Sequence, residues 1–187
     1  MAFRWRTLGD GRIEILGLGV PRLRDAAAAR FDRTVARWRA LISSNAKRTG
    51  VPAAWIAAVV DAESGGDPRA VSPAGATGLM QIMPSWWRGH TAEQMKDGAL
   101  SLQIGSDLLA SIRRTQPALP VVASVYNGGS DTATNAPRLR PKLPWGMLEN
   151  TGYISRVVAG NNYAIESRAF GRARGSSSTT FPVLLVA

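Results

Sequence analysis

The chain has 187 residues and a formal net charge of +10, with 45% hydrophobic and 19% charged residues. This composition is typical of a globular protein and excludes wholesale disorder, and the length allows one catalytic domain with an appendage. The sequence contains no cysteine, and His90 is its single histidine. Disulfides, thiolate zinc sites, cysteine nucleophiles and multi-histidine metal sites are therefore excluded, and a Ser-His-Asp triad would need His90. We expect no metal and no cofactor.

The first 23 residues have the pattern of a β-hairpin. Trp5 alternates with arginines before an Asp-Gly turn signal, and Ile13 and Ile15 alternate after it. We therefore expect residues 1–23 to form a basic, hairpin-like N-terminal arm.

Residues 24–170 are mostly helical in pattern, with apolar side chains that recur every three or four positions. Gly50 is a plausible stop for the first helix, and Pro52 fits the first turn of the second. We expect a mainly α domain over residues 24–170, and its predicted helices run through Phe31–Ile42, Pro52–Val60, Leu100–Ile112, Val121–Asn127 and Ile154–Ala164.

The last 17 residues, 171–187, combine the flexible linker GRARGSSSTT with the β-prone ending FPVLLVA, which could form a small β element with the N-terminal segment. FPVLLVA is also the longest apolar run and is far shorter than the roughly 20 residues that span a bilayer, so we expect no membrane span. The N-terminus lacks the apolar core of a secretory signal. We expect delivery to any substrate outside the cytoplasm to depend on another component.

The positive charge is concentrated at the two ends of the chain. Residues 1–50 hold 11 basic and 4 acidic residues, a net of +7, and residues 51–170 hold 10 and 9, a net of +1; residues 171–187 add +2. Positively charged ends of this kind are typical of proteins that bind a polyanion, namely nucleic acid, anionic lipid or an acidic wall polymer. They also fit the simpler explanation that the arginines cover a solvated helix face. No nucleic-acid motif accompanies the arginines, so we do not expect nucleic acid as the partner.

Glu63 ends an apolar helix and precedes a loop rich in Gly, Pro and Ser. Such a loop lets a backbone approach a ligand closely. Burial at that helix end would raise the pKa of the Glu63 carboxyl and keep it protonated, which is the state of a general acid. From position alone, an exposed helix-end glutamate is the more common structure.

The order of the motifs along the chain favours a general acid at Glu63 over an exposed helix-end glutamate. The chain contains Glu63-Ser64, then Ser72, then GLMQIMP at residues 78–84, then YNGG at 126–129 and ENTGY at 149–153. This order resembles the lytic transglycosylase family of the SLT type, whose pattern reads ES…S-x-x-GA-x-GLMQ-x-MP…AYN-x-G…E-x-x-x-Y. The resemblance covers roughly residues 38–168, and it implies a mainly α, lysozyme-like fold around a glycan cleft.

For the reaction, the resemblance implies cleavage of the β-1,4 bond between N-acetylmuramic acid and N-acetylglucosamine in peptidoglycan. Glu63 would protonate the glycosidic oxygen and then act as base while the muramoyl C6 hydroxyl attacks C1. The product would carry a 1,6-anhydro end, and the substrate's own N-acetyl group would stabilise the cationic intermediate.

The resemblance also implies roles for residues around Glu63. Ser64 and Glu149 would support the site, and Tyr153 would orient the Glu63 carboxyl. The glycan-binding residues would be Ser72, Gln81, Met83, Tyr126, Asn127 and Tyr153. Gln81 offers both donors and an acceptor for N-acetyl and hydroxyl groups, and the thioether of Met83 is an adaptable apolar surface.

No second catalytic carboxylate is obvious in the sequence, although a two-carboxylate glycosidase needs one about 5–10 Å from the acid. Asp61 lies two residues before Glu63 and hence on another helix face, and Asp67 lies in a GGDP turn, which aspartate commonly supports. Glu149 matches a supporting position of the family. This favours the transglycosylase reaction.

Some positions depart from the family pattern, among them Val125 in place of alanine and Asn150 in place of threonine. Trp86 and Trp87 are also unusual, and we expect them to pack rather than to stack on sugars. These departures concern subfamily and glycan subsites, not Glu63.

Three alternatives remain open at this stage. The first is a hydrolytic muramidase or endolysin that shares the fold. The second is a nucleic-acid-binding module, which the net charge of +7 in residues 1–50 suggests. The third is a structural particle component with a vestigial enzyme domain. We expect a wall-degrading enzyme that a bacteriophage particle delivers, with residues 1–50 and 171–187 contacting particle proteins. A free endolysin fits almost as well.

Overall fold

A computed structural model describes residues 4–87, 89–128 and 151–171. The mainly α fold that the sequence predicts is confirmed, with little strand. Its elements are β1 (Trp5–Thr7), β2 (Ile13–Ile15), α1 (Asp25–Thr49), α2 (Ala53–Ser64), the short 3-10 helices η1 (Pro84–Trp86) and η2 (Gln94–Lys96), α3 (Gly98–Thr115), α4 (Leu119–Gly128) and α5 (Thr151–Glu166).

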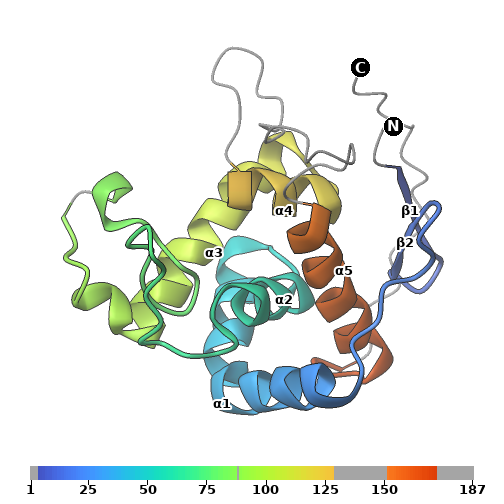
Figure 1. Ribbon diagram of the computed structural model, residues 1–187, viewed down its shortest axis with the longest axis horizontal. Helices are drawn as coiled ribbons and strands as arrows, with labels where there is room; N and C mark the ends of the chain where they lie inside the picture. Colours follow the sequence, from blue (N-terminus) through green and yellow to red (C-terminus); the bar gives the residue numbers. More distant parts are fainter. Residues whose placement is uncertain (1–3, 88, 129–150, 172–187) are drawn as a thin grey trace.

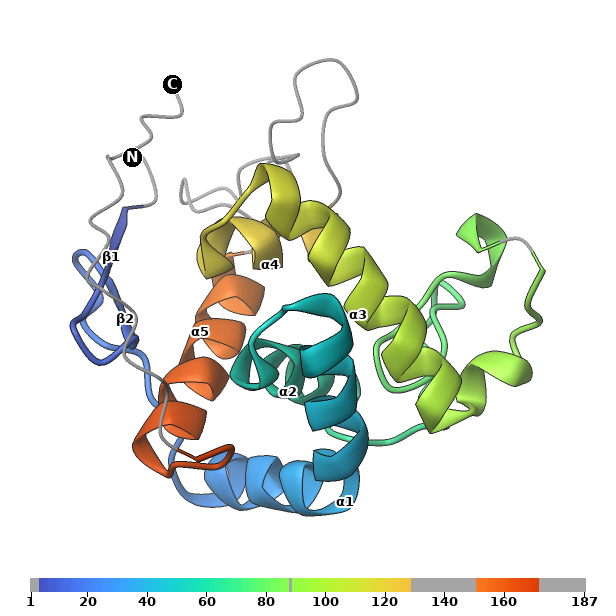
Figure 2. The ribbon, with the colours of Figure 1, turned by 180° about the vertical axis from the view of Figure 1, so that it is seen from behind.

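The central element is α2, which the other helices surround (Figures 1 and 2). Six consecutive residues, 56–61, are buried in α2, and the first five of them are apolar, as expected for a helix inside a core. Helices α1 and α5 pack directly against α2, and α3 and α4 complete the ring by packing between α1 and α5. The core therefore encloses the helix whose last turn carries Glu63.

The helix ends explain why the sequence pattern located the helices well. α1 ends where Gly50 adopts a φ of 74°, and Asp97 caps α3 by accepting hydrogen bonds from the N–H groups of Ala99 and Leu100 at 2.8 and 2.9 Å. Pro52 differs slightly from the prediction: it is the N-cap residue of α2, because its ψ of 134° is extended and the helix begins at Ala53.

The N-terminal segment forms an antiparallel hairpin in which Trp5 pairs with Ile15 and Thr7 with Ile13. The hairpin is attached to α5 by Asn162, whose side chain is fully buried. Asn162 accepts a 2.8 Å hydrogen bond from the Ile13 N–H and donates to the carbonyls of Ile13 and Pro21 at 2.9 and 3.0 Å. The Asn162 amide thus bonds to the backbone N–H and carbonyl of Ile13, as the backbone of a neighbouring strand would. Residues 172–187, the expected C-terminal contributor to this sheet, lie outside the described residues.

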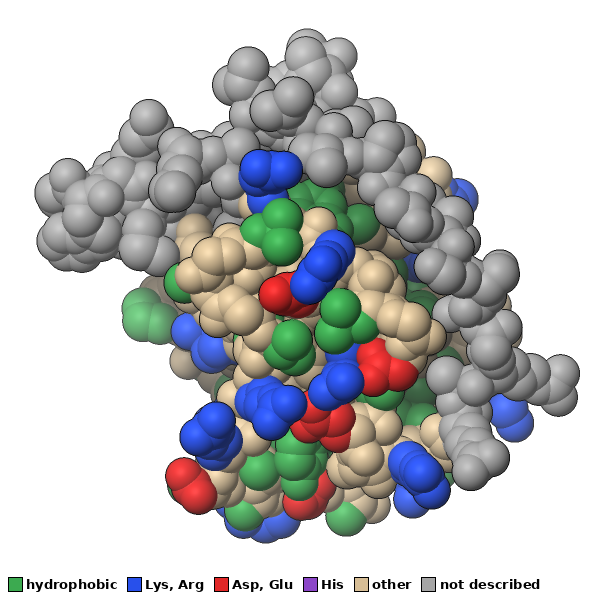
Figure 3. All heavy atoms as spheres, turned by 90° about the vertical axis from the view of Figure 1, so that its right-hand side faces the viewer, with side chains coloured by type: hydrophobic (Ala, Val, Ile, Leu, Met, Phe, Trp, Pro, Cys, Tyr) green, Lys and Arg blue, Asp and Glu red, His purple; other side chains and the backbone are tan. Residues whose placement is uncertain are grey.

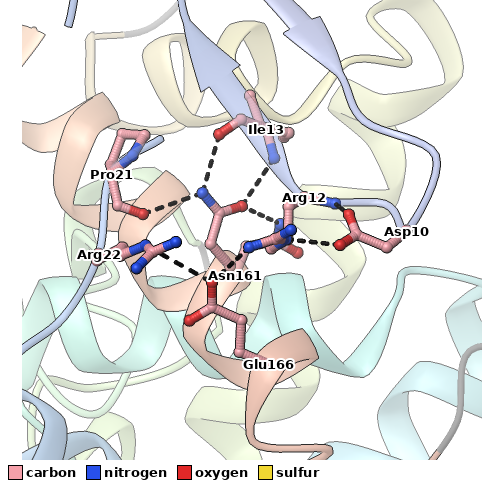
Figure 4. A network of polar contacts seen from close by, with 8 residues as sticks. Asp10, Arg12, Ile13, Pro21, Arg22, Asn161 and Glu166 are labelled. Atoms are coloured by element: carbon pink, nitrogen blue, oxygen red, sulfur yellow. Dashed lines mark hydrogen bonds and ion pairs between the residues drawn. The ribbon is translucent and has the colours of Figure 1, made fainter. Parts of the chain in front are cut away.

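Much of the positive charge near the hairpin is paired with acidic side chains. Arg12 donates to Glu166 of α5 at 2.7 Å and to Asp10 at 2.6 Å (Figure 4). Arg6 pairs with Glu14. On the face that includes the hairpin, basic and acidic side chains are interspersed (Figure 3). This face is therefore not a continuous basic surface. None of the described helices is both long and apolar enough to cross a membrane.

The segment between α2 and α3 is largely irregular and lies on the opposite side of α2 from the hairpin (Figure 1). Two isolated bridges, Val71–Thr77 and Thr77–Ile82, fold it back on itself. Trp87 packs against the core, as expected, whereas the side chain of Trp86 lies outside the described part of the structure. This segment carries the GLMQ motif to the end of α2.

Candidate active site

Glu63 lies one residue before the end of α2, where the buried central helix meets the irregular segment. The helix stops because Gly65 and Gly66 adopt left-handed φ angles of 62° and 86°, which favour glycine. The Ser64 hydroxyl donates a 2.8 Å hydrogen bond to the carbonyl of Leu79. This bond joins the turn after Glu63 to the GLMQ motif and gives Ser64 a structural task.

Tyr153 contacts Glu63 from α5, on the other side of the site. Its hydroxyl donates a 2.7 Å hydrogen bond to Oε1 of Glu63. The Tyr153 side chain is buried, so its ring is held by the packing of α5 against α2. The structure therefore brings together the two residues that the sequence pattern places 90 positions apart.

The environment of Glu63 changes its acidity. Burial raises the pKa of Glu63 from 4.5 to about 7, while the hydrogen bond from Tyr153 and the positive charge of Arg156 act in the opposite direction. A carboxyl with this pKa is partly protonated at neutral pH and can both donate and accept a proton. Because Tyr153 donates to Oε1, Oε2 is the oxygen that would carry the proton toward a ligand.

Tyr126 of α4 holds the GLMQ motif from a third direction. Its hydroxyl donates a 2.8 Å hydrogen bond to the carbonyl of Met80. Burial and the nearby charge of Glu63 raise the pKa of Tyr126 well above 10, so the phenol stays neutral and keeps its proton for this bond. Tyr126 thus fixes the loop in addition to any contact with a glycan.

Gln81 has an uncommon backbone conformation, with a φ of 49°. Its Nε2 donates two hydrogen bonds of 3.0 Å, to the carbonyls of Ala70 and Gly78. The donors of the side chain are therefore used by the loop itself, and Oε1 is the atom through which Gln81 could bind a ligand. This narrows the role that the sequence suggested, in which both donors and acceptor were counted.

The remaining predicted binding residues lie on separate elements of the structure. Ser72 closes a tight turn, since its hydroxyl accepts a 3.0 Å hydrogen bond from the Ala76 N–H. Met83 precedes η1 and Asn127 lies in the last turn of α4; both are partly exposed. Their contact with a glycan stays a prediction. Glu149 lies outside the described residues.

The other carboxylates near Glu63 in sequence have structural partners. Asp61 is buried and receives two hydrogen bonds from Arg30 of α1, on the side of α2 away from Tyr153. Asp67 accepts a 2.8 Å hydrogen bond from the Arg69 N–H and so supports its turn. Both observations agree with the sequence argument against a second catalytic carboxylate. Among the described residues, no three His, Cys, Asp or Glu side chains gather as metal ligands would.

Sequence reasoning missed Arg156. Its guanidinium carbon lies 5.8 Å from the centre of the Tyr153 ring, and its charge lowers the pKa of Glu63. The signal for it was available, because residues three apart on a helix share a face and α5 was predicted. The sequence alone did not show that an ionisable group lies opposite α5, so the spacing could not identify Arg156 as a residue that acts on it.

A ring of helices around a buried helix that ends in an ionisable carboxyl defines a lysozyme-like fold, and comparison with known proteins agrees. The family model for the transglycosylase SLT domain matches residues 40–143, more than half of the chain. The protein therefore belongs to the SLT transglycosylase family.

Individual proteins are similar to parts of this chain in sequence or in fold. The Staphylococcus aureus protein named "Probable transglycosylase IsaA" is 44% identical over 55 residues, which are 29% of this chain and 24% of that protein. The 70 kDa soluble lytic transglycosylase of Escherichia coli has a similar fold, with a TM-score of 0.58 and 22% identity over 72% of this chain and 25% of that one.

The lytic transglycosylase Slt of Pseudomonas aeruginosa gives a TM-score of 0.55 with 23% identity, again over 72% of this chain and 25% of that one. The 70 kDa soluble lytic transglycosylase in complex with bulgecin A gives 0.59 with 20% identity, over 78% and 26%. The chain thus matches about a quarter of the length of these proteins, and at these identities the structures show the common fold.

Proposed function

We propose that the protein cleaves the glycan strands of peptidoglycan as a lytic transglycosylase and that Glu63 is its catalytic acid and base. One observation carries this proposal: the Glu63 carboxyl is held by Tyr153 and has a pKa of about 7 at the end of a buried helix in an SLT-family chain. A general acid of this kind works best when its pKa is close to the working pH.

In the proposed reaction, protonated Glu63 donates its proton to the glycosidic oxygen between N-acetylmuramic acid and N-acetylglucosamine, and the bond from that oxygen to C1 breaks. The resulting Glu63 carboxylate then takes the proton of the muramoyl C6 hydroxyl while O6 bonds to C1. Glu63 regains its proton, no water is consumed, and the glycan ends in a 1,6-anhydro ring.

We propose the binding side of the site from the residues that the family motifs select. Oε1 of Gln81 would accept a hydrogen bond from an N-acetyl or hydroxyl group, because Nε2 already bonds to the loop. Met83 and Asn127, both partly exposed, would contact the sugar, and Ser72 would contribute from the loop turn. Tyr126 would line the cleft while it holds Met80.

Mass spectrometry of the products released from purified peptidoglycan tests this proposal. We expect muropeptides with anhydro ends from the wild-type protein, and Glu63→Gln should release them at a rate lower by about 10²–10⁴-fold, since general acid–base catalysis contributes that much. Near-normal release by Glu63→Gln would falsify the assignment of Glu63. The matched control is Glu93→Gln, an exposed glutamate near η2 that pairs with Lys96, which should leave the rate unchanged.

Hydrolytic cleavage is the alternative outcome of the same experiment. A muramidase adds water, so each product would be heavier by one water and would carry a reducing end. That result would keep Glu63 as the acid and would replace only the C6 hydroxyl by water as the nucleophile.

Delivery by a bacteriophage particle is a separate proposal, which the excess of positive charge in residues 1–50 supports as a docking feature. Proteomics of purified particles tests it. Detection of the chain at a fixed copy number supports delivery by the particle, and its absence from particles together with failed lysis on deletion indicates a free endolysin.

A further inference from the structure

Three side chains of α1 point at the last turn of α2 from successive turns of their own helix. They are Arg30, Thr34 and Trp38, which we call the α1 row. Residues four apart share a helix face, so the α1 row forms a single line along α1. Helix α1 lies beside α2 (Figures 1 and 2), and the α1 row meets α2 at the turn that carries Glu63.

The first member holds the turn just before Glu63. Nε and Nη2 of Arg30 donate to Oδ1 and Oδ2 of Asp61 at 2.9 and 2.8 Å, a two-pronged ion pair. The Asp61 side chain is 6% exposed, so the pair is largely shielded from water on its acidic side. The two hydrogen bonds fix the orientation of the Asp61 carboxylate relative to Arg30, and burial shields this interaction from water.

The other two members hold the backbone just after Glu63. The Thr34 hydroxyl donates to the carbonyl of Gly65 at 3.1 Å, and the Trp38 indole N–H donates to the carbonyl of Gly66 at 3.0 Å. These carbonyls point away from the helix because both glycines are left-handed, so they need donors from outside α2.

The approach of α1 to this turn is close. A Cβ at Gly66 would lie 2.6 Å from the Thr34 hydroxyl oxygen, so a side chain there would displace Thr34, and a Cβ at Gly65 would lie 3.1 Å from Cδ of Arg30, a tight contact. The φ angles favour glycine at both positions of the ESGG sequence, and the contact with the α1 row adds a steric requirement at Gly66.

We propose that the α1 row consists of positioning residues, which set the direction and the burial of the Glu63 carboxyl by fixing the backbone on both sides of it. The inference rests on the proposed function of Glu63. It extends the machinery beyond the family match, which begins at residue 40, after all three members.

The physical argument is that, among the described residues, the Glu63 side chain has one hydrogen-bonding anchor, the Tyr153 hydroxyl, and takes the rest of its placement from the backbone. If the turn loosens, water reaches the carboxyl, and its pKa falls from about 7 toward 4.5. Within the described part of the chain, the groups that act on Glu63 are Tyr126, Tyr153 and Arg156, none of which belongs to α1. Loss of the α1 row should therefore change the chemistry without removing a ligand contact.

The test uses Thr34→Val and Trp38→Phe, singly and together. Each removes one donor; Thr34→Val keeps the shape of the side chain, whereas Trp38→Phe also removes part of a packed ring. The kinetic constants for release from soluble glycan strands are measured from pH 5 to pH 9. We expect the double variant to lose about 10- to 100-fold in kcat, the range that a small misplacement costs, with KM changed by less than about twofold. The basic limb of its pH profile should move to lower pH.

Thr34→Ser is the conservative variant, because it keeps the hydroxyl and should restore both kcat and the pH profile. Thr115→Val is the matched control; its hydroxyl bonds to the Ile112 carbonyl in α3, at the end of another helix. The inference is overturned if folded Thr34→Val and Trp38→Phe keep the wild-type kcat and pH profile, or if Thr34→Ser is as impaired as Thr34→Val.

Failure of the proposed function is distinguishable from failure of this inference. If the wild-type protein releases no muropeptides, or Glu63→Gln is fully active, the proposed function is wrong. If the wild type is active and Glu63→Gln is inactive while the α1 variants behave as wild type, only the positioning role is wrong. Should Trp38→Phe fail to fold, because its ring lies against Gly98, Thr34→Val and Thr34→Ser still decide the question.

Discussion

The Tyr153 hydroxyl donates a 2.7 Å hydrogen bond to Oε1 of Glu63 and so joins α5 to the last turn of α2. This bond has two consequences that oppose each other. It aims the carboxyl, and it stabilises the ionised form, which holds the pKa of Glu63 below the value that burial alone would give. The remaining raised pKa of about 7 is the balance of burial against Tyr153 and Arg156.

Replacement of Tyr153 by phenylalanine separates these two consequences. We expect Tyr153→Phe to lower kcat by about 10- to 100-fold, the equivalent of the 1.5–3 kcal/mol that a hydrogen bond to a charged group contributes. We also expect the basic limb of the pH profile to move up, because the pKa of Glu63 rises when its donor is lost. Kinetics from pH 5 to pH 9 measure both effects.

Tyr163→Phe is the control for that change. Tyr163 is also on α5 and its hydroxyl donates to Asp32 at 2.9 Å, on the side of α1 and away from Glu63. It should keep the wild-type kcat and pH profile. Equal loss of activity in the two variants would mean that the effect comes from α5 packing rather than from the Glu63 bond.

Glu63 should also make the folded protein less stable as the pH rises. Its pKa is about 7 in the folded state, against an ordinary value of 4.5 for a solvated glutamate, so the folded state holds the proton more tightly than the unfolded chain. Stability contributed by the bound proton is complete below pH 4.5 and is lost as the pH rises through 7, a loss of about 3 kcal/mol at about 1.4 kcal/mol per pH unit.

Glu63→Gln has no such proton to lose, because its amide does not titrate. We therefore expect the variant to unfold at a higher denaturant concentration than the wild type at pH 8 and at a similar one at pH 4.5. Urea unfolding followed by circular dichroism measures the difference. A variant that is equally stable, or less stable, at pH 8 would show that Glu63 is not desolvated in the folded state.

Removal of the Arg156 charge should shift the pH profile in the opposite direction to the loss of the α1 row. Because its charge lowers the pKa of Glu63, Arg156→Gln should raise that pKa and move the basic limb of the pH profile upward. Arg114→Gln, an exposed arginine at the end of α3, is the control and should not move it. An unchanged profile in Arg156→Gln would mean that solvent screens this charge from the site.

Much of the fold could be predicted from the sequence because local signals and the core pattern agree. The apolar residues around Ile56 and Val60 predicted an apolar helix, and Gly50 predicted a stop, since both properties belong to a few neighbouring residues. The hairpin pattern around Ile13 was equally local. Its attachment to α5 was not predictable, because it depends on contacts between distant residues, namely the hydrogen bonds of Asn162 to Ile13, 149 residues away, and the ion pair of Arg12 with Glu166.

The site could be predicted in part, and through the motif order rather than through chemistry. That order selected Glu63 and Tyr153, and the contact between them depends on how α5 packs on α2. The left-handed φ of Gln81, and the use of its amide donors by the loop, have no local signal in the sequence. By its spacing Arg156 shares a helix face with Tyr153, but its effect on Glu63 depends on how α5 packs against α2, which has no local signal.

Asn162 provides the last prediction, which concerns the hairpin. In Asn162→Ala the N–H and the carbonyl of Ile13 lose their partner in a buried position, and an unsatisfied buried group costs about 1–3 kcal/mol. We expect faster amide exchange and faster proteolytic cleavage in residues 4–23, with stability of the helical core reduced less. Ser44→Ala, an exposed position on α1, is the control and should behave as wild type. Unchanged exchange at the Ile13 amide in Asn162→Ala would mean that the salt bridge between Arg12 and Glu166 suffices to hold the hairpin.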